Sequence, residues 1–406
     1  MDNYLASRLI ICGCGPGELV AWVRPLLAAL AQTERRWQTT LVLWPRLFLS
    51  GHEAETARQL PGVDQILSPG RSLALLAGAP LPWSDAGPRS SVLLHMGGAP
   101  FLSLRLGRRL GAPVLAYCEQ PNRLPSGFNA IYCTDSCKSM AAGVTPIGNL
   151  LVDAVFALRD RRLDLDAGDP ALILGLLPGS RAFQLRHYLT RVGPVADALS
   201  RRVDALQFLI ARSPLVDDDM VRDALGTGAG ARMVQEQDVT ALITDQGLRI
   251  PLVDPAEVLC RAHCLLSTPG TNTGEAAALG IPHLVVAPFD PSFKMFSGML
   301  GLIERSHWLG RPLKRWALRY LTGDGAYYAQ ANARAGHEIV PELQGPLDIE
   351  RVTDCLANLL LDAHRRKRIS SELSGVMGPP GAASRLVSEL ERKVVESAHN
   401  PTSNRL

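Results

Sequence analysis

Two hydrophobic patterns alternate along this chain. Short runs of aliphatic residues, such as SRLIICG (7–13) and SVLLHMG (91–97), have the length and the β-branched content of buried strands. The stretches between them, such as LVAWVRPLLAAL (19–30), repeat their apolar positions at helical spacing. Strands that alternate with helices in this way build parallel sheets with helices on both faces, so the predicted fold class is α/β.

The same alternation starts again after residue 165, with ALILGLLPGS (171–180) followed by a helical stretch from about Phe183 to Arg202. Between the two blocks, LRDRRLDLDAGDP (158–170) is charged, has no apolar period and contains Gly and Pro, which indicates a linker. The sequence therefore predicts two α/β domains in tandem. Their expected bounds are 1–157 for the first domain, 158–170 for the linker, 171–380 for the second domain, and 381–406 for a closing helix and tail.

Composition narrows the class of protein. The chain has 406 residues, 47% of them apolar, and a net charge of +3, which is typical of a globular protein large enough for two cores. No uninterrupted apolar stretch approaches the roughly 18 residues of a membrane-spanning helix, so we expect a cytoplasmic protein. The eight cysteines lack the paired spacing of metal ligands, and we expect buried, reduced thiols. The nearly balanced charge, without a basic face that carries aromatic residues, argues against nucleic-acid binding.

Three loops follow predicted strands at positions where α/β proteins bind ligands. In an open parallel sheet the carboxyl ends of the strands meet at one edge, and the helices that follow point their free N–H groups there. The first of these loops is GCGPGE (13–18), in which Gly15 and Gly17 allow a ligand to approach the backbone closely. A tight turn by itself also selects glycine, so a binding loop and a simple turn both remain open.

The second loop, LLPGSR (176–181), opens the second block at the equivalent point. Gly179 and Ser180 supply backbone freedom and a hydroxyl, and Arg181 adds a planar array of donors that suits phosphate. A surface arginine in a turn is the alternative. We favour a phosphate site because the third loop also offers groups that bind an anionic oxygen.

The third loop, STPGTNTGEAAALGIP (267–282), leads from a strand into a helix through small polar residues. Its candidate anion ligands are the backbone amides and hydroxyls of Gly270, Thr271, Asn272 and Thr273. Glu275, in the first helical turn, can stabilise the helix start or accept two hydrogen bonds from a ribose diol, and both interpretations stay open.

Four segments in order along the chain resemble the lipid-A-disaccharide synthase family. They are IGNLLVD (147–153), LLPGSR (176–181), STPGTNTGEAAALGIP (267–282) and AGHEIVPELQG (335–345). The resemblance implies the GT-B fold, in which two Rossmann-like, doubly wound domains face a central cleft. It also implies an inverting glycosyltransferase that transfers an acylated amino sugar from UDP-2,3-diacylglucosamine to 2,3-diacylglucosamine 1-phosphate at the inner membrane face.

The resemblance further implies roles for the two domains and for the candidate residues. The N-terminal domain would hold the lipid-type acceptor, and the C-terminal domain would bind the UDP-sugar donor. Near the phosphates or the sugar it places Gly179, Ser180 and Arg181. At the diphosphate it places Gly270, Thr271 and Thr273, and at the ribose Glu275. The residues implied to close the donor pocket are Glu338, Pro341, Glu342 and Gln344. A helix start with arginines can stabilise a departing diphosphate without a metal ion, so we expect neither a metal ion nor a cofactor.

Three departures from the family pattern concern catalysis. The acidic D-x-P-D-F pattern expected after an N-terminal strand is LLHMGGAPFLSL (93–104) here, with no carboxylate. The S-G-D expected after the first strand is PGEL (16–19), so Glu18 is a candidate to replace that acid. The glutamate expected after the arginine loop is Gln184. This combination resembles the divergent branch of lipid-A-disaccharide-synthase-related proteins.

An inverting transfer needs a base for the acceptor hydroxyl and hydrogen-bond donors for the departing diphosphate. The catalytic candidates are Glu18 and His95, although a lone histidine at a strand end is more often structural. Two alternatives to a transferase remain. A catalytically silent UDP-sugar-binding protein would keep the donor site without a base, and a UDP-N-acetylglucosamine 2-epimerase-like enzyme would need several acidic residues around the sugar.

A basic amphipathic stretch over 293–321 mixes Phe, Met, Leu and Trp with lysines and arginines. Such a stretch can lie in the headgroup region of an anionic membrane, which predicts a peripheral contact with the inner membrane face. A helix pair that packs on its domain with its charges in solvent is the alternative. A homodimer is compatible with the sequence.

Overall fold

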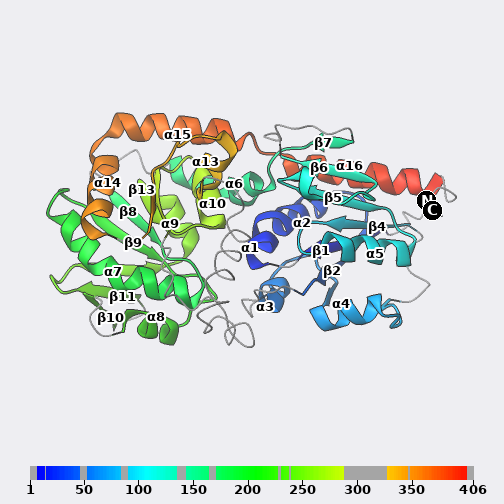
Figure 1. Cartoon of the computed structure of the whole chain (residues 1–406), viewed down its shortest axis with the longest axis horizontal. Helices are drawn as coiled ribbons and strands as arrows, with labels where there is room; N and C mark the ends of the chain where they lie inside the picture. The colour runs from blue at the N-terminus through cyan, green and yellow to red at the C-terminus, as the bar shows by residue number, and fades with distance from the viewer. Residues whose placement is uncertain are drawn as a thin grey trace, which may run out of the picture. The chain divides into compact units, whose positions relative to one another are not determined.

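The computed structural model describes residues 7–13, 15–45, 53–83, 90–134, 143–163, 171–226, 230–236, 239–287, 327–345 and 348–399. The chain separates into two compact units. Unit 1 consists of Met1–Ala154 with Gly378–Leu406, and unit 2 of Val155–Met377. Each unit has its own sheet, and Figure 1 labels the strands and helices where there is room.

The described part of unit 1 forms a seven-stranded sheet with the order β3-β2-β1-β4-β5-β6-β7, in which all neighbours run parallel. The strands are β1 (Ser7–Gly13), β2 (Trp37–Leu43), β3 (Gln65–Leu67), β4 (Ser90–His95), β5 (Val114–Cys118), β6 (Ala130–Cys133) and β7 (Val144–Pro146). β1 is buried along its whole length, as expected for a central strand that helices cover on both faces. The strand order changes direction between β1 and β4, the position where ligands bind in sheets of this type.

Helices cover both faces of the unit 1 sheet. They are α1 (Pro16–Glu18), the π-helical turn η1 (Leu19–Val23), α2 (Arg24–Leu30), α3 (Glu53–Arg58), α4 (Pro69–Leu76), α5 (Pro100–Leu110), the 3-10 turn η2 (Pro121–Arg123) and α16 (Ala382–His399). A further helix, α6 (Leu150–Leu163), begins in unit 1 and continues into unit 2 from Val155. Leu9 and Ile11 of β1 belong to one apolar cluster, together with residues of α2 and α16. Ile10 and Cys12 belong to a second cluster with residues of α4 and α5. The two-residue period of β1 thus divides its side chains between the two faces.

The last helix, α16, returns the chain to unit 1. The Tyr132 hydroxyl donates a hydrogen bond to Glu389 Oε2 at 2.9 Å. The Asp153 carboxylate accepts hydrogen bonds from the backbone N–H groups of Gly381 and Ala383, both at 2.6 Å. A negative charge at the start of α16 also interacts favourably with the helix dipole. Asp153 therefore fixes the point at which the chain rejoins unit 1.

The described part of unit 2 forms an eight-stranded sheet with the order β10-β11-β12-β9-β8-β13-β14-β15. The strands are β8 (Ile173–Leu177), β9 (Gln207–Ala211), β10 (Ala231–Glu236), β11 (Val239–Thr244), β12 (Arg249–Val253), β13 (Cys264–Ser267), β14 (His283–Ala287) and β15 (Glu342–Gln344). From β12 to β15 all neighbours are parallel, and the order changes direction between β8 and β13. β10 and β11 extend the edge as antiparallel strands.

The unit 2 helices are α7 (Ala182–Ser200), α8 (Asp218–Leu225), α9 (Pro255–Arg261), α10 (Thr271–Ala278), α13 (Gln330–Ala335), α14 (Ile349–Leu361) and α15 (Ala363–Met377). A glycine in the central strand β8 allows close packing here. A Cβ atom at Gly175 would lie 2.5 Å from Val258 Cγ1 of α9 and 2.5 Å from Leu265 Cδ2 of β13. Only a residue without a side chain fits at that position.

The prediction of two α/β blocks is confirmed, with three differences in detail. The range assigned to a linker, 158–170, begins inside α6, which continues to Leu163. Most of this part of the helix is exposed, so its sequence shows no apolar period. The closing segment, 381–406, provides a helix to unit 1 and is not an independent element. The antiparallel strands β10 and β11 were not predicted.

No helix among the described residues is long and apolar enough to cross a bilayer. Residues 293–321, for which a membrane contact is predicted, lie outside the described residues. The cysteines in the described part of the chain are free thiols: Cys12, Cys118, Cys133, Cys260, Cys264 and Cys355.

Candidate functional site

Two of the predicted loops meet in unit 2. β8 and β13 are parallel neighbours, and Ser267 pairs with Leu177 at their carboxyl ends. The backbone N–H of Thr268 then donates to the Leu177 carbonyl at 3.3 Å. A Cβ atom at Gly179 would lie 3.2 Å from Thr268 Oγ1. The loops after β8 and β13 therefore leave the sheet side by side, at the point where its strand order changes direction.

Gly179 and Gly270 have the backbone conformations that these loops require. Gly179 has a φ of 84° and Gly270, which precedes α10, has a φ of 151°. Gly270 is exposed, and Thr271 and Asn272 are partly exposed. Because the first N–H groups of an α-helix have no partner within the helix, this end of α10 can bind an anionic oxygen.

The hydroxyl of Thr273, predicted to bind an anion, forms hydrogen bonds within the fold instead. It is fully buried, and its Oγ1 donates to the Gly270 carbonyl at 2.9 Å. The same oxygen accepts a hydrogen bond from the backbone N–H of Gln330 at 3.2 Å. Thr273 thus connects the start of α10 to α13, and its hydroxyl proton is already used within the loop.

Thr268 is a candidate that the sequence reasoning missed. Its side chain is 3% exposed, and its hydroxyl has no hydrogen-bond partner among the described residues. A buried hydroxyl without a partner is unfavourable, so a ligand oxygen at this position would satisfy it. In the sequence, Thr268 is only the residue that follows the end of a buried strand.

Ser180, Arg181 and Glu275 lie on the same two loops and helices. Arg181 is exposed and directly precedes α7, whereas Ser180 and Glu275 are partly buried. Gln184, in the first turn of α7, contacts the same glycine: a Cβ atom at Gly179 would lie 2.7 Å from its Oε1. The structure therefore brings the predicted phosphate and ribose residues into one region of unit 2.

The residues predicted to close the donor pocket have different positions. Glu342 is partly buried, and its carboxylate accepts hydrogen bonds from the N–H groups of Tyr328 and Ala329 and from Asn332 Nδ2, each at 2.8 Å. The carbonyl of the buried Pro341 accepts from the N–H of Val285 at 3.0 Å. Glu338 and Gln344 are exposed. Glu342 therefore positions the segment before α13, which the short sequence motif did not indicate.

In unit 1, the loops after β1 and β4 bring together Glu18 and Gly97. The backbone N–H of Gly15 donates to Glu18 Oε2 at 3.2 Å, which is a capping interaction within the first turn. A Cβ atom at Gly97 would lie 2.2 Å from the same carboxylate oxygen. Gly15 is buried, and Gly17 and Glu18 are partly buried. The predicted acid thus lies where the strand order of unit 1 changes direction.

His95 lies inside unit 1. Its side chain is 4% exposed, its Nδ1 forms a hydrogen bond of 2.9 Å with Ser103 Oγ, and Trp44 Nε1 donates to the same hydroxyl at 3.0 Å. Burial lowers the pKa of His95 to about 4. A neutral imidazole surrounded by core residues is poorly placed to take a proton from a substrate, so the prediction of His95 as a base has no support in the structure, and Glu18 stays a prediction.

The buried imidazole predicts a loss of stability in acid. In the unfolded chain histidine titrates near pH 6.5, whereas burial keeps the folded pKa of His95 at about 4. The unfolded state therefore binds the proton first, and stability present above pH 6.5 is lost as the pH falls towards 4, by up to about 1.4 kcal/mol per pH unit. Urea unfolding at pH 7.5 and pH 5 should show a smaller acid loss for His95→Asn than for the parent. Equal losses would contradict this assignment, because the other buried histidines of the described structure, His187 and His283, are present in both proteins.

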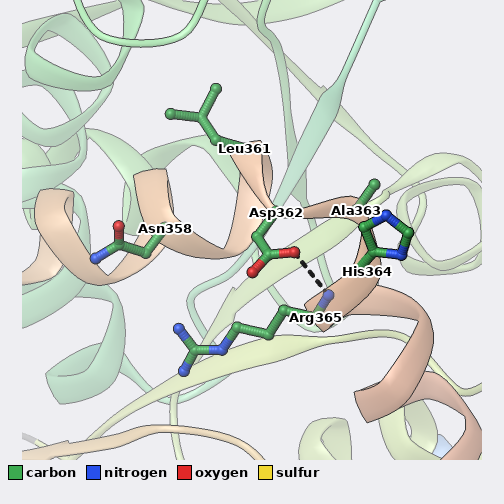
Figure 2. Close-up of a pocket in the computed structure, with 6 residues that line it drawn as sticks. All are labelled: Asn358, Leu361, Asp362, Ala363, His364 and Arg365. Atoms are coloured by element: carbon green, nitrogen blue, oxygen red, sulfur yellow. Dashed lines mark hydrogen bonds between the residues drawn. The ribbon is translucent and has the colours of Figure 1, made fainter.

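A hollow of about 470 Å³ lies elsewhere in unit 2, at the junction of α14 and α15. Figure 2 shows its six lining residues, which are Asn358, Leu361, Asp362, Ala363, His364 and Arg365. Asp362 Oδ1 accepts from the Arg365 backbone N–H at 2.8 Å and so caps α15. None of the predicted donor residues lines this hollow, so it is not the candidate sugar-nucleotide site. Within the described ranges, no group of three or more His, Cys, Asp or Glu is arranged to hold a metal ion.

Comparison with known proteins gives relatives of one kind. No family model matches the chain. The lipid-A-disaccharide synthase of Myxococcus xanthus is 25% identical over 356 residues, 80% of this chain and 79% of that protein. The synthase of Syntrophotalea carbinolica is 28% identical over 76% of this chain and 75% of that protein. The alignment with the Nitrosococcus oceani synthase, at 28% identity, spans about half of each protein, 55% of this chain and 48% of the relative.

Solved structures show the fold. A UDP-GlcNAc 2-epimerase from Neisseria meningitidis, bound to UDP-GlcNAc, superposes with a TM-score of 0.55 over 95% of this chain and 100% of that chain, at 12% identity. The calicheamicin glycosyltransferase CalG4 superposes with a TM-score of 0.51 over 97% of this chain and 99% of that chain, at 12% identity. Both comparisons, together with the two Rossmann-like sheets, show the GT-B fold. Seven curated relatives, all named lipid-A-disaccharide synthase, are 23–28% identical to this chain, which therefore resembles that family at low identity.

Proposed function

We propose that this protein is an inverting glycosyltransferase that transfers an acylated amino sugar from a UDP-sugar to a lipid-type acceptor. The observation that carries the proposal is the meeting of two glycine-containing loops at the direction change of the unit 2 sheet, beside the start of α10. Helix starts at such positions bind phosphate groups in α/β proteins. The names of the curated relatives support the same reaction class.

Unit 2 would carry the donor residues. The N–H groups of Gly270, Thr271 and Asn272 would bind the diphosphate, and the hydroxyl of Thr268 would donate to one of its oxygens. Gly179 and Ser180 would allow the phosphates to approach the second loop, with Arg181 adding positive charge. Glu275 would accept two hydrogen bonds from the ribose diol.

Unit 1 would carry the base. The Glu18 carboxylate would take the proton from the acceptor hydroxyl as that oxygen forms a bond to the anomeric carbon of the sugar. On the opposite face of this carbon, the bond to the UDP oxygen breaks, and its electron pair leaves with UDP. The N–H groups of α10 and the charge of Arg181 stabilise the negative charge that develops on the diphosphate.

The test is UDP release from UDP-N-acetylglucosamine and from its acylated derivatives, with and without an acylated glucosamine phosphate as acceptor. Acceptor-dependent release with inversion at the anomeric carbon is the expected result. Donor binding without release under all conditions would support a silent binding protein instead. Formation of a 2-epimer would support the epimerase-like alternative.

The ribose assignment predicts that Glu275→Ala weakens UDP binding by roughly 10- to 100-fold, because two hydrogen bonds to a charged group are lost. Isothermal titration with UDP is the measurement. In the structure α10 has no acidic residue in its first turn, so the prediction that Glu275 lies there is wrong. Glu257→Ala is the control, since it removes another carboxylate of unit 2, from the first turn of α9. If both variants bind UDP as the parent does, Glu275 only stabilises its helix.

The membrane contact predicted for residues 293–321 and the homodimer belong to the same proposal. Flotation of the protein with anionic liposomes tests the membrane contact. Light scattering after gel filtration tests the oligomeric state. Absence of flotation would remove the membrane contact without affecting the donor assignments.

A further inference from the structure

The position of Glu18 in unit 1 depends on a residue of another loop. β1 and β4 are parallel neighbours, with Cys12 opposite His95, and the pairing continues one step further as the Met96 N–H donates to the Cys12 carbonyl at 2.8 Å. Gly97 follows directly at the end of this strand. It therefore faces the loop that follows β1, at the direction change of the sheet.

The Glu18 carboxylate occupies the space of a missing side chain at residue 97. A Cβ atom at Gly97 would lie 2.2 Å from Glu18 Oε2, 2.8 Å from its Cδ and 3.3 Å from its Oε1. These distances cover the whole carboxylate group. No side chain larger than hydrogen can be present at residue 97 while Glu18 keeps this position.

Backbone conformation does not explain the glycine. Gly98, the next residue, has a φ of 85°, which favours glycine, but Gly97 is not among the residues with positive φ. An alanine would be acceptable to the Gly97 backbone. What opposes a larger residue at this position is therefore the Glu18 carboxylate, which would have to move to make room for a Cβ atom.

The first turn of α1 holds the same carboxylate from the other side. The Gly15 N–H donates to Oε2, the oxygen nearest to the Gly97 position. Glu18 is therefore fixed between its own helix start and the end of β4, and it remains partly exposed. The contact with Gly97 joins the loops after β1 and β4.

We propose that Gly97 is the positioning residue for Glu18, and that residues 18 and 97 are alternative attachment points for one carboxylate at this place. The Cβ of an aspartate at residue 97 would lie within the present volume of the Glu18 carboxylate, so its carboxyl group, one bond further, reaches the same region. The catalytic meaning of this inference rests on the proposed function, in which the carboxylate accepts the proton of the acceptor hydroxyl.

The experiment moves the carboxylate from one loop to the other. Gly97→Ala should lower kcat for UDP release at least tenfold, and Glu18→Gly should lower it by roughly 100-fold or more. The affinity for UDP should stay unchanged in both variants, because the donor residues are in unit 2.

The double variant Glu18→Gly/Gly97→Asp should have a kcat at least tenfold higher than that of Glu18→Gly. Formate added to Glu18→Gly should also restore part of the rate. A double variant no faster than Glu18→Gly, or a Gly97→Ala variant with the parent's kcat, would overturn the proposal.

A second measurement does not depend on catalysis. Gly97→Ala should lower the unfolding temperature of the parent but have a smaller effect in the Glu18→Gly background, because the clash is then absent. Gly107→Ala is the matched control: its Cβ would lie 2.0 Å from Val114 Cγ2, so its cost should be equal in both backgrounds. If no variant or parent releases UDP but this coupling is present, the proposed function fails and the positioning role stands. If the parent transfers sugar but the coupling is absent, the positioning role fails alone.

Discussion

Glu18→Gln should lower kcat for sugar transfer by about 10²- to 10⁴-fold, the usual contribution of a general base. Glutamine keeps the shape of glutamate, and its amide oxygen can still accept the hydrogen bond from the Gly15 N–H. It cannot take a proton from the acceptor hydroxyl. Only the rate of the chemical step should therefore fall. The affinity for UDP, which depends on unit 2, should stay the same. Initial rates of UDP release at saturating donor and titration with UDP measure the two effects.

The control for this variant is Glu34→Gln, which makes the same chemical change at an exposed residue of unit 1. It should transfer sugar at the parent's rate. If Glu18→Gln retains more than a tenth of the parent's kcat, another group is the base and the replacement of the family's missing acid by Glu18 is wrong.

Asn332→Ala should lower the free energy of unfolding of unit 2 by about 3–5 kcal/mol, because several buried polar groups lose their partners together. The fully buried Asn332 side chain accepts from the N–H groups of Ile339 and Val340 through Oδ1. Its Nδ2 donates to the Val340 carbonyl and to Glu342 Oε1, both at 2.8 Å. The loop between α13 and β15 therefore depends on this one amide group.

Calorimetry should show a decrease of roughly 10 °C in the transition of unit 2, since one kcal/mol corresponds to about 2–4 °C in a unit of this size. Asn358→Ala, at an exposed position of α14, is the control and should leave the transition unchanged. If the transition temperatures of Asn332→Ala and of this control differ by less than about one degree, the loop reorganises and satisfies its polar groups in another way.

The order of strands and helices could be predicted because parallel strands covered on both faces are continuously apolar. β1 and β8 are buried at every position, and both were identified from their aliphatic runs. β10 and β11 were missed because they form the edge of the sheet, where several side chains remain partly or fully exposed and the apolar run is lost. The helical part of 158–163 was missed for the same reason: an exposed helix has no apolar face to recognise.

For the candidate site, the sequence identified the loops but not the task of each side chain. Glycine content and small polar residues indicated the loops around Gly179 and Gly270, because such loops need backbone freedom and open N–H groups. Residue type did not distinguish Thr268, whose hydroxyl lacks a partner in the described chain, from Thr273, whose hydroxyl is used within the fold. Both are threonines in one short motif.

The sequence by itself determined the fold class, the two α/β units, the candidate donor loops and the absence of an acid in the β4–α5 loop. These properties follow from local patterns of burial and backbone freedom, which depend on residues close together in the sequence. Only the tertiary structure decided that His95 is a core residue, that Glu342 positions a loop, and that Gly97 makes room for Glu18. Each of these depends on a contact between residues distant in sequence, and the pairing of strands β1 and β4 is what brings the Glu18 carboxylate to residue 97.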